Sequence, residues 1–188
     1  MQLPLAASFV DKASGARVPG LIHIAFDQHL LWWTGWRYDA KDEDRSWDWW
    51  GIYRECGSSA GRYECYAAEA ADALQGLMVL DLRGMRTSAR KAIIVDYLAT
   101  NPANRAANRG LKYVGIALIA VAIRRGMEKG TGGRIWLESL PGAASFYESL
   151  GMDRQSGRSA EGNLIYVLEP RVAEQLLEKI KENRIVEP

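Results

Sequence analysis

One continuous segment, residues 92–127, constrains the fold of this chain more than any other. It begins with the apolar run AIIVDYLA, continues through the polar loop TNPANRAANRG, and enters LKYVGIALIAVAIRRGM. The first run predicts a buried strand, because it is short, apolar and rich in β-branched residues. In the last part, apolar residues recur at helical spacing, at Leu111, Val114, Leu118 and Val121. We therefore expect a strand that leads through a loop into a long, half-buried helix.

The start of this helix is a candidate phosphate site. The first N–H groups of a helix have no partner inside it, and that end carries partial positive charge, so it suits a pyrophosphate. Small residues lie near this start, and Arg105, Arg109 and Lys112 add positive charge. A solvated, basic helix start that binds nothing is the alternative.

The rest of the chain alternates between strand-like and helix-like runs. Strands are expected in RYECYAAEA, LMVLDL at 77–82, GRIWLESL at 133–140 and NLIYVLE at 163–169. A short helix is expected between Pro141 and Gly151, and RVAEQLLEKIKENR predicts an amphipathic helix. The unit 92–140 is long enough for a right-handed parallel crossover. The pattern predicts an α/β (α+β) fold, with a mixed, partly parallel twisted sheet and helices on both faces.

The first 60 residues hold a cluster of tryptophans that fits neither strand nor helix periodicity. Six of them lie within nineteen residues, which is more than a small core absorbs easily, so some are expected to line a groove or an interface. Packing in the core is the equal alternative. Trp47, Trp50 and Tyr53 have helical spacing after the acidic run at 42–44. That acidic run favours a cationic partner, although a solvated loop explains it too.

Bulk properties exclude several classes of protein. The 24 basic and 23 acidic residues nearly cancel, which disfavours a nucleic-acid or anionic-lipid partner. The longest apolar run, 114–123, is about half of the roughly 20 residues that a membrane span needs. The N-terminus lacks the pattern of a signal peptide, so a cytoplasmic, non-membrane protein is expected. Neither Cys nor His residues have metal-ligand spacing, and no metal is expected.

Three segments resemble the GNAT N-acetyltransferase family: VDYLATNPANR, KYVGIALIAVAI and GRIWLESLPGAASFYESLGM. In that family a pantetheine-binding strand, a pyrophosphate loop, a further strand and a terminal helix follow in this order. The family's loop commonly reads Arg/Gln-x-x-Gly-x-Gly/Ala. Here Gly115 takes the last position, while Gly110 and Tyr113 depart from the other two. The ending FYESLGM at 146–152 follows the family's FYxxxGF-like pattern.

The resemblance implies a single acetyltransferase domain, 1–188, with a core at 61–169, an acceptor-side segment at 1–60 and a C-terminal helix at 170–188. Its reaction would be direct transfer of an acetyl group from acetyl-CoA to a primary amine of a small molecule, without a metal. A macromolecular amine is an alternative acceptor: a protein lysine, a protein N-terminus or an aminoacyl-tRNA. A non-catalytic acyl-CoA-binding module is a further alternative. The apolar face of the C-terminal helix is a candidate surface for a homodimer.

The resemblance also implies the residues that hold the cosubstrate. Backbone groups of Leu98, Ala99 and Thr100 would pair with the pantetheine arm as an added strand does. The N–H groups of 110–117 would hold the pyrophosphate. The residues concerned are Arg105, Arg109, Gly110, Lys112, Tyr113, Val114, Gly115, Ile116 and Ala117.

Three residues are candidates for proton transfer. The family often uses a tyrosine at the position of Tyr147 to protonate the departing thiolate, although core packing explains this residue as well. Strand alternation places Asp96 on one face with Ile94 and Leu98, an apolar setting that raises a carboxyl pKa and suits a general base. A carboxylate held by a neighbouring arginine is the alternative. Glu138 is the second candidate base, and water chains can replace either.

The N-terminal segment commonly shapes the acceptor site in this family. The resemblance therefore makes the tryptophans candidates for an aromatic acceptor pocket. The residues concerned are Trp32, Trp33, Trp36, Trp47 and Trp50. His23 and His29 have no spaced partner and are expected to have no direct role.

Overall fold

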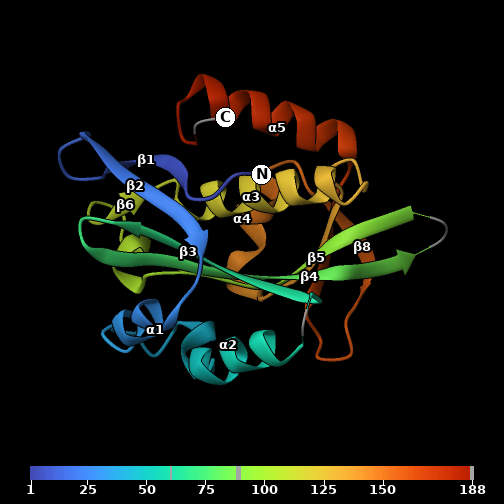
Figure 1. The fold of residues 1–188 in the computed structure, drawn as a ribbon, viewed down its shortest axis with the longest axis horizontal. Coiled ribbons are helices and arrows are strands. Elements are labelled where there is room, and N and C mark those ends of the chain that lie inside the picture. The colour runs from blue at the N-terminus through green and yellow to red at the C-terminus, as the bar shows by residue number, and fades with distance from the viewer. Residues whose placement is uncertain (60, 88–89, 187–188) are drawn as a thin grey trace.

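The computed structural model describes residues 1–59, 61–87 and 90–186, which form one twisted sheet with helices on both faces (Figure 1). The nine strands lie in the order β6-β1-β2-β3-β4-β5-β7-β9-β8. Every neighbouring pair is antiparallel except β5 and β7, which are parallel. The predicted mixed, partly parallel sheet is confirmed.

The elements have the following bounds. The strands are β1 (Leu5–Asp11), β2 (Arg17–Ile24), β3 (Tyr63–Ala70), β4 (Ala73–Thr87), β5 (Arg90–Thr100), β6 (Leu111–Lys112), β7 (Ile135–Ser139), β8 (Asp153–Arg158) and β9 (Leu164–Leu168). The helices are α1 (Asp27–Trp33), α2 (Trp49–Ser58), α3 (Val114–Glu128), α4 (Ala144–Ser149) and α5 (Pro170–Glu182). Short 3₁₀ helices are η1 (Glu43–Ser46), η2 (Pro102–Arg105) and η3 (Pro141–Ala143).

Two hydrophobic clusters cover the two faces of the sheet. The larger cluster buries α3 against the strands, with α5 packed over α3, whereas the smaller cluster packs α1 and α2 against β3 and β4 (Figure 1). The apolar residues of α5, including Val172, Leu176 and Ile180, contact the larger cluster. That face is therefore used inside the chain, which corrects the expectation that it is free to pair with a second copy.

The parallel pair β5 and β7 creates an opening in the sheet. The two strands pair only from Ile93 to Val95, opposite Ile135 to Leu137. Beyond these residues β5 continues along β4, and β7 continues along β9. The strands therefore diverge toward their carboxyl ends, and α4 follows β7 across the gap.

The helix in the 92–127 segment begins later than its apolar spacing suggests. Leu111 and Lys112 form β6, which pairs with Val10 and Asp11 of β1. Tyr113 then has a φ of 76°, in the left-handed region, and α3 begins at Val114. Because the chain reverses direction at Tyr113, Leu111 belongs to the sheet and not to the helix.

Other boundaries also differ from the sequence prediction. The polar linker at 83–91 extends β4 and β5, and its residues 88–89 lie outside the described part. The C-terminal helix ends at Glu182; the chain then returns to β1, where Val186 bridges Ala7. The last two residues of the predicted 170–188 helix also lie outside that part. Strands β1, β2 and β8 were not predicted.

Candidate active site

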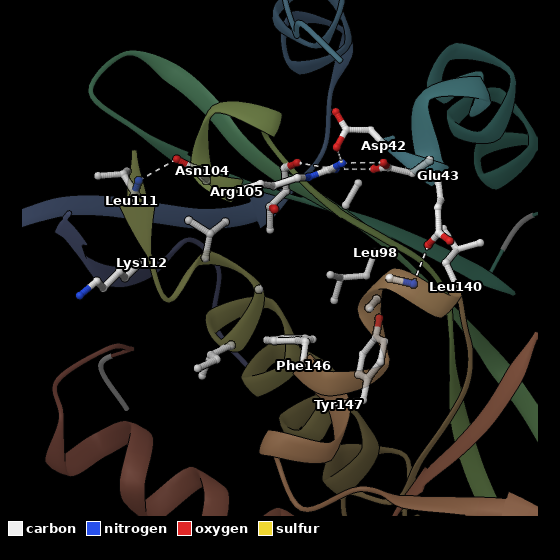
Figure 2. A pocket seen from close by; sticks show the side chains of 18 of the residues that line it. Asp42, Glu43, Leu98, Asn104, Arg105, Leu111, Lys112, Leu140, Phe146 and Tyr147 are labelled. Carbon is white, nitrogen blue, oxygen red and sulfur yellow. Dashed lines mark hydrogen bonds and ion pairs between the residues drawn. The ribbon is translucent and has the colours of Figure 1, made fainter. Parts of the chain in front are cut away.

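The larger of two neighbouring cavities, about 810 Å³, lies between the carboxyl end of β5 and the start of α3 (Figure 2). Most of the residues predicted to hold a cosubstrate line it: Leu98, Ala99, Thr100, Arg105, Lys112, Tyr113, Val114, Gly115 and Ile116. Arg109, Gly110 and Ala117 do not, and Ala117 is fully buried in the core. The predicted strand and helix start are thus brought together around one space.

Main-chain N–H groups face this cavity at the start of α3. The first hydrogen bond of the helix runs from the N–H of Ala117 to the carbonyl oxygen of Tyr113, at 2.9 Å. The N–H groups of Val114, Gly115 and Ile116 are therefore not used by the helix. A Cβ atom on Gly115 would lie 3.1 Å from the ring of Phe146, so this position is tight.

The outer edge of β5 also offers main-chain groups to the cavity. Leu98, Ala99 and Thr100 pair with β4 on one side only, because β7 has already diverged. The carbonyl oxygen of Thr100 accepts a hydrogen bond from Arg105 Nη2 at 3.0 Å. The edge at Leu98 and Ala99 remains open to an added strand.

The loop between β5 and α3 is fixed by residues that the sequence did not single out. Asn104 donates through Nδ2 to Gln75 Oε1 at 3.0 Å, and its Oδ1 accepts from the N–H of Leu111 at 2.7 Å. Lys12 Nζ donates to the carbonyl oxygens of Asn104 and Ala106, each at 2.6 Å. These contacts join the loop to β1 and β4, and they place Lys12 in the cavity wall.

An acidic strap, residues 41–44, closes one side of the larger cavity. Arg105 donates to both carboxylate oxygens of Asp44, at 2.8 and 2.6 Å, and pairs with Asp42 at 2.8 Å (Figure 2). Glu43 accepts a hydrogen bond from the N–H of Gly142 at 2.8 Å (Figure 2). The charge of Arg105 is therefore balanced by the strap, and the lysines supply the remaining positive charge of this cavity.

The smaller cavity, about 450 Å³, adjoins the larger one at the divergence of β5 and β7. Leu98, Leu140, Ala143 and Tyr147 line both spaces. All three candidates for proton transfer, Tyr147, Asp96 and Glu138, line the smaller cavity. The cavities therefore meet at Tyr147.

Tyr147 lies on α4 with its ring packed and its hydroxyl in the space between the cavities. It is 5% exposed, and its ring lies 5.1 Å from Phe146 and 5.9 Å from Tyr166, between centroids. The hydroxyl points toward Leu98 and Leu140 (Figure 2) and has no hydrogen-bond partner within the described ranges. Burial raises the pKa of Tyr147 above its ordinary value, so the phenol stays protonated at neutral pH.

Comparisons with solved structures decide the fold. The toxin AtaT, a mutant bound to the C-terminus of the antitoxin AtaR and to acetyl-CoA, is 18% identical, with a TM-score of 0.56 over 84% of this chain and 98% of that chain. FdhC, a nucleotide-linked sugar GNAT, is 12% identical, with a TM-score of 0.62 over 96% and 98%. A Bacillus subtilis acetyltransferase in complex with CoA is 18% identical, with a TM-score of 0.51 over 79% and 97%.

The chain has the GNAT fold. At these identities the likeness concerns the arrangement of the backbone, as the resemblance in sequence predicted. Neither a protein-family model nor a curated protein matches the sequence. In the described ranges, no helix is both long and apolar enough to cross a membrane.

Within the GNAT fold of this chain, Asp96 lies at a β-bulge. Val79 pairs with Tyr97 and Leu80 pairs with Val95, which leaves Asp96 as the extra residue of β5. The alternation therefore changes phase at Asp96. The prediction that Ile94 and Leu98 share a face is wrong, because Leu98 packs with Val95 against the larger cluster.

Asp96 is exposed at the smaller cavity and yet electrostatically disfavoured as an anion. Desolvation by the surrounding walls is the main cause that raises its pKa, and the negative charge of Asp81 adds to it. Among the described side chains, no arginine pairs with Asp96, and Arg62 pairs with Asp81 instead, at 2.8 Å.

Two further residues of the smaller cavity escaped the sequence analysis. Trp136 lies on β7, two residues before Glu138, and Glu161 lies on the turn between β8 and β9. Neither carries a local signal, because each reaches the cavity only through the pairing of distant strands.

Of the five tryptophans predicted to form the acceptor pocket, Trp47 alone lines one of these two cavities. Its ring contacts Tyr97 edge to face, with centroids 5.1 Å apart. Trp36 is buried and donates to the carbonyl oxygen of Leu74 at 3.3 Å. The other three, Trp32, Trp33 and Trp50, pack against the smaller cluster. Most of the aromatic segment therefore builds the α1 and α2 face.

His23, His29 and Glu69 gather under α1. His23 Nε2 lies 3.3 Å from Glu69 Oε1, and His29 Nε2 lies 3.4 Å from Glu69 Oε2. His29 Nδ1 accepts the N–H of Phe26, at 3.1 Å, which caps α1 and leaves the ring proton on Nε2, facing Glu69. Burial lowers the pKa of His29, so the ring is neutral at neutral pH. His29 therefore stabilises the start of α1.

Proposed function

We propose that this protein is an acetyl-CoA-dependent N-acetyltransferase that acts on a primary amine of a small molecule. One observation carries the proposal: a large cavity with free main-chain donors meets a small acidic cavity at the unpartnered hydroxyl of Tyr147. The whole chain, 1–188, acts as one domain with the core at 61–169. The segment 1–60 contributes Trp47 to the smaller cavity, and Lys12 and the strap at 41–44 to the larger one. GNAT-fold proteins with acetyl-CoA or CoA bound support the choice of cosubstrate.

The larger cavity would hold the cosubstrate. Its pyrophosphate would accept hydrogen bonds from the N–H groups of 114–116, where the helix dipole adds positive potential. Lys112, Lys12 and Lys41 line the same cavity and complement the charge. The pantetheine arm would lie along the open edge of β5 at 98–99, and the thioester would then reach Tyr147.

The chemistry needs a neutral amine, a polarised carbonyl and a protonated leaving group. Asp96 accepts a proton from the ammonium, directly or through water, and its raised pKa improves the match. The amine nitrogen forms a bond to the thioester carbon, the carbon–sulfur bond breaks, and Tyr147 protonates the thiolate. Glu138 is the second candidate base. The residues at the junction orient the reactants, which itself lowers the barrier.

Two alternatives make different predictions. An aminoacyl-tRNA would bring phosphates to a cavity whose charged lining is acidic, which is unfavourable. A non-catalytic module would bind acyl-CoA without turnover, and two features favour it: the departure at Tyr113 and the strap at 41–44 that lines the cosubstrate cavity. Turnover separates this module from an enzyme.

The test is release of free thiol from acetyl-CoA in the presence of a panel of primary amines. We expect turnover by the native chain and a fall in kcat of about 10² in Tyr147→Phe, with little change in the KM for acetyl-CoA. Tyr63→Phe is the matched control, because Tyr63 lines neither cavity. Tight binding of CoA without thiol release from any amine would establish the binding module instead.

A further inference from the structure

We propose that the acceptor is a small, flexible amine with at least two positive charges, such as a linear diamine, rather than a monoamine or an anionic molecule. The inference rests on the proposed function and names the substrate class of the smaller cavity. It follows from the charges and the aromatic walls of that cavity and from the hydroxyl of Tyr147 at its junction with the larger one.

Every charged residue that lines the smaller cavity is acidic. Asp96 comes from β5, Glu138 from β7 and Glu161 from the turn between β8 and β9. Throughout the described part of the chain, none of the three forms an ion pair, and the only side-chain partner of Glu161 is the hydroxyl of Ser159. Three carboxylates around one space of about 450 Å³ make the lining negative, and no ion pair among the described residues balances this charge.

This arrangement differs from the acidic groups of the strap. Asp42 and Asp44 are also close together, but Arg105 binds both of them. The protein itself therefore neutralises these two carboxylates. In the smaller cavity no such ion pair is found among the described residues. Desolvation and the neighbouring carboxylates Asp81 and Glu138 raise the pKa of Asp96, although the charge of Arg62 opposes them.

A single ammonium cannot balance this charge during the reaction. The nitrogen that attacks the thioester must first lose its proton, and it is then neutral. The favourable interaction with the remaining carboxylates must come from a group that stays protonated. A second ammonium on the same molecule supplies that group, because an alkylammonium has a pKa near 10.

The aromatic walls fit the same ligand. Trp47, Tyr97 and Trp136 line the cavity, and Trp47 packs edge to face on Tyr97. Indole and phenol rings attract ammonium groups through their faces and also pack against methylene chains. An anionic acceptor would meet the same rings without this attraction and would be repelled by the three carboxylates.

The hydroxyl of Tyr147 fixes the reacting end of the ligand. It belongs to a residue that is only 5% exposed, points into the junction of the cavities, and lacks a partner in the described part of the chain. In the reaction R–NH₃⁺ plus acetyl-CoA gives R–NH–COCH₃, CoA–SH and one proton. The base first removes the ammonium proton, and the carbon–nitrogen bond then forms as the carbon–sulfur bond breaks. Tyr147 gives its proton to the departing thiolate. It regains a proton, through solvent, from the nitrogen of the tetrahedral intermediate.

The experiment compares 1,4-diaminobutane with butylamine, which has the same chain length and one charge fewer. Steady-state thiol release is measured at saturating acetyl-CoA and at two salt concentrations. We expect kcat/KM to be at least about tenfold higher for the diamine, through KM, and this advantage to shrink as salt rises. Equal kcat/KM values, or a preference for butylamine, would overturn the inference while turnover itself upholds the proposed function.

A variant assigns the effect to the cavity. Glu161→Gln should raise the KM for the diamine about tenfold, with kcat unchanged and a smaller effect on butylamine. Glu178→Gln, on the exposed side of α5, is the matched control and should match the native chain. An unchanged KM in Glu161→Gln would contradict the assignment.

Calorimetry with CoA alone separates the two proposals if no amine in the panel is acetylated. The absence of acetylation overturns the inference about the acceptor, whether or not CoA binds. CoA binding would then leave the larger cavity's assignment in place, and its absence would remove the proposed function as well.

Discussion

The two cavities that meet at Tyr147 are built from different parts of the chain. The larger one presents main-chain groups: the N–H groups at 114–116 and the edge of β5 at 98–99. The smaller one presents side chains from β5, β7 and the turn between β8 and β9, with Trp47 from the segment before α2. A site made from backbone depends on shape, whereas a site made from side chains depends on residue identity.

This difference explains which changes each cavity tolerates. Most side chains at 98–100 and 114–116 can vary while the N–H and carbonyl groups stay in place, except where a glycine leaves room for a neighbour. The smaller cavity can change its ligand through a single substitution, because its charge comes from three residues. We expect variants in the two cavities to separate cosubstrate binding from acceptor choice.

The largest expected effect is on the backbone site. Gly115→Glu puts a carboxylate at the helix start, and its Cβ atom would press against Phe146 at 3.1 Å. We expect CoA affinity, measured by isothermal titration calorimetry, to fall by more than about a thousandfold, because both the space and the potential are lost.

The matched control for this variant is Gly57→Glu. Gly57 lies near the exposed end of α2, where a Cβ atom meets nothing within 4 Å. CoA affinity should be unchanged there. The account would be contradicted if Gly115→Glu is folded, as judged by circular dichroism, and still binds CoA with the affinity of the native chain. The larger cavity would then not depend on the backbone at the start of α3.

The next effect distinguishes tryptophans of the core from the one at the cavity. Trp36→Ala should lower the free energy of unfolding by about 3 kcal/mol or more, because Trp36 is buried and hydrogen-bonded. Trp47→Ala should act mainly on the KM for the acceptor, since Trp47 lines the smaller cavity. Urea denaturation and steady-state kinetics measure the two. The same stability loss with unchanged KM in Trp47→Ala would place this residue in the core.

A smaller effect concerns pH. The pKa of Asp96 is raised in the folded protein, so ionisation of Asp96 disfavours folding. The neutral form stabilises the folded state at low pH, and this stability is lost as pH rises through the raised pKa. Asp96→Asn should therefore raise the free energy of unfolding at neutral pH and lower kcat/KM by about tenfold or more. It should also remove the acid limb of the pH–rate profile. A limb that persists would transfer the base role to Glu138.

The smallest effect is at Tyr113. Its φ of 76° is unfavourable for a residue with a Cβ atom, and glycine adopts it without strain. Tyr113→Gly should raise the free energy of unfolding by about 1 kcal/mol at most and leave CoA affinity within about twofold. Chemical denaturation and calorimetry measure both. A large loss of CoA affinity would mean that the tyrosine ring itself contacts the cosubstrate.

The backbone site was predictable because its signals are local. A strand, a loop and an apolar helix with a glycine near its start lie within 36 residues, and helix geometry alone supplies the free N–H groups. The start of α3 was misplaced because Tyr113 has a conformation that its residue type does not indicate.

The smaller cavity was predictable only in part, because it depends on contacts between distant segments. Asp96 and Glu138 were identified, but the bulge at Asp96 broke the alternation used to place it. Glu161 and Trp136 gave no signal, since strand pairing in space brings them to the site. The prediction that the tryptophans form an acceptor pocket was mostly wrong, because composition gives the number of aromatic residues and not the face of the sheet that they cover.

The central claim is that the start of α3 binds the diphosphate of CoA and delivers its thiol to Tyr147. A crystal structure with CoA tests it most directly. We expect phosphate oxygens within hydrogen-bond distance of the N–H groups at 114–116 and the sulfur beside the Tyr147 hydroxyl. Crystals grown at saturating CoA in which the strap at 41–44 and neighbouring side chains occupy that space, or in which CoA binds elsewhere, would contradict it.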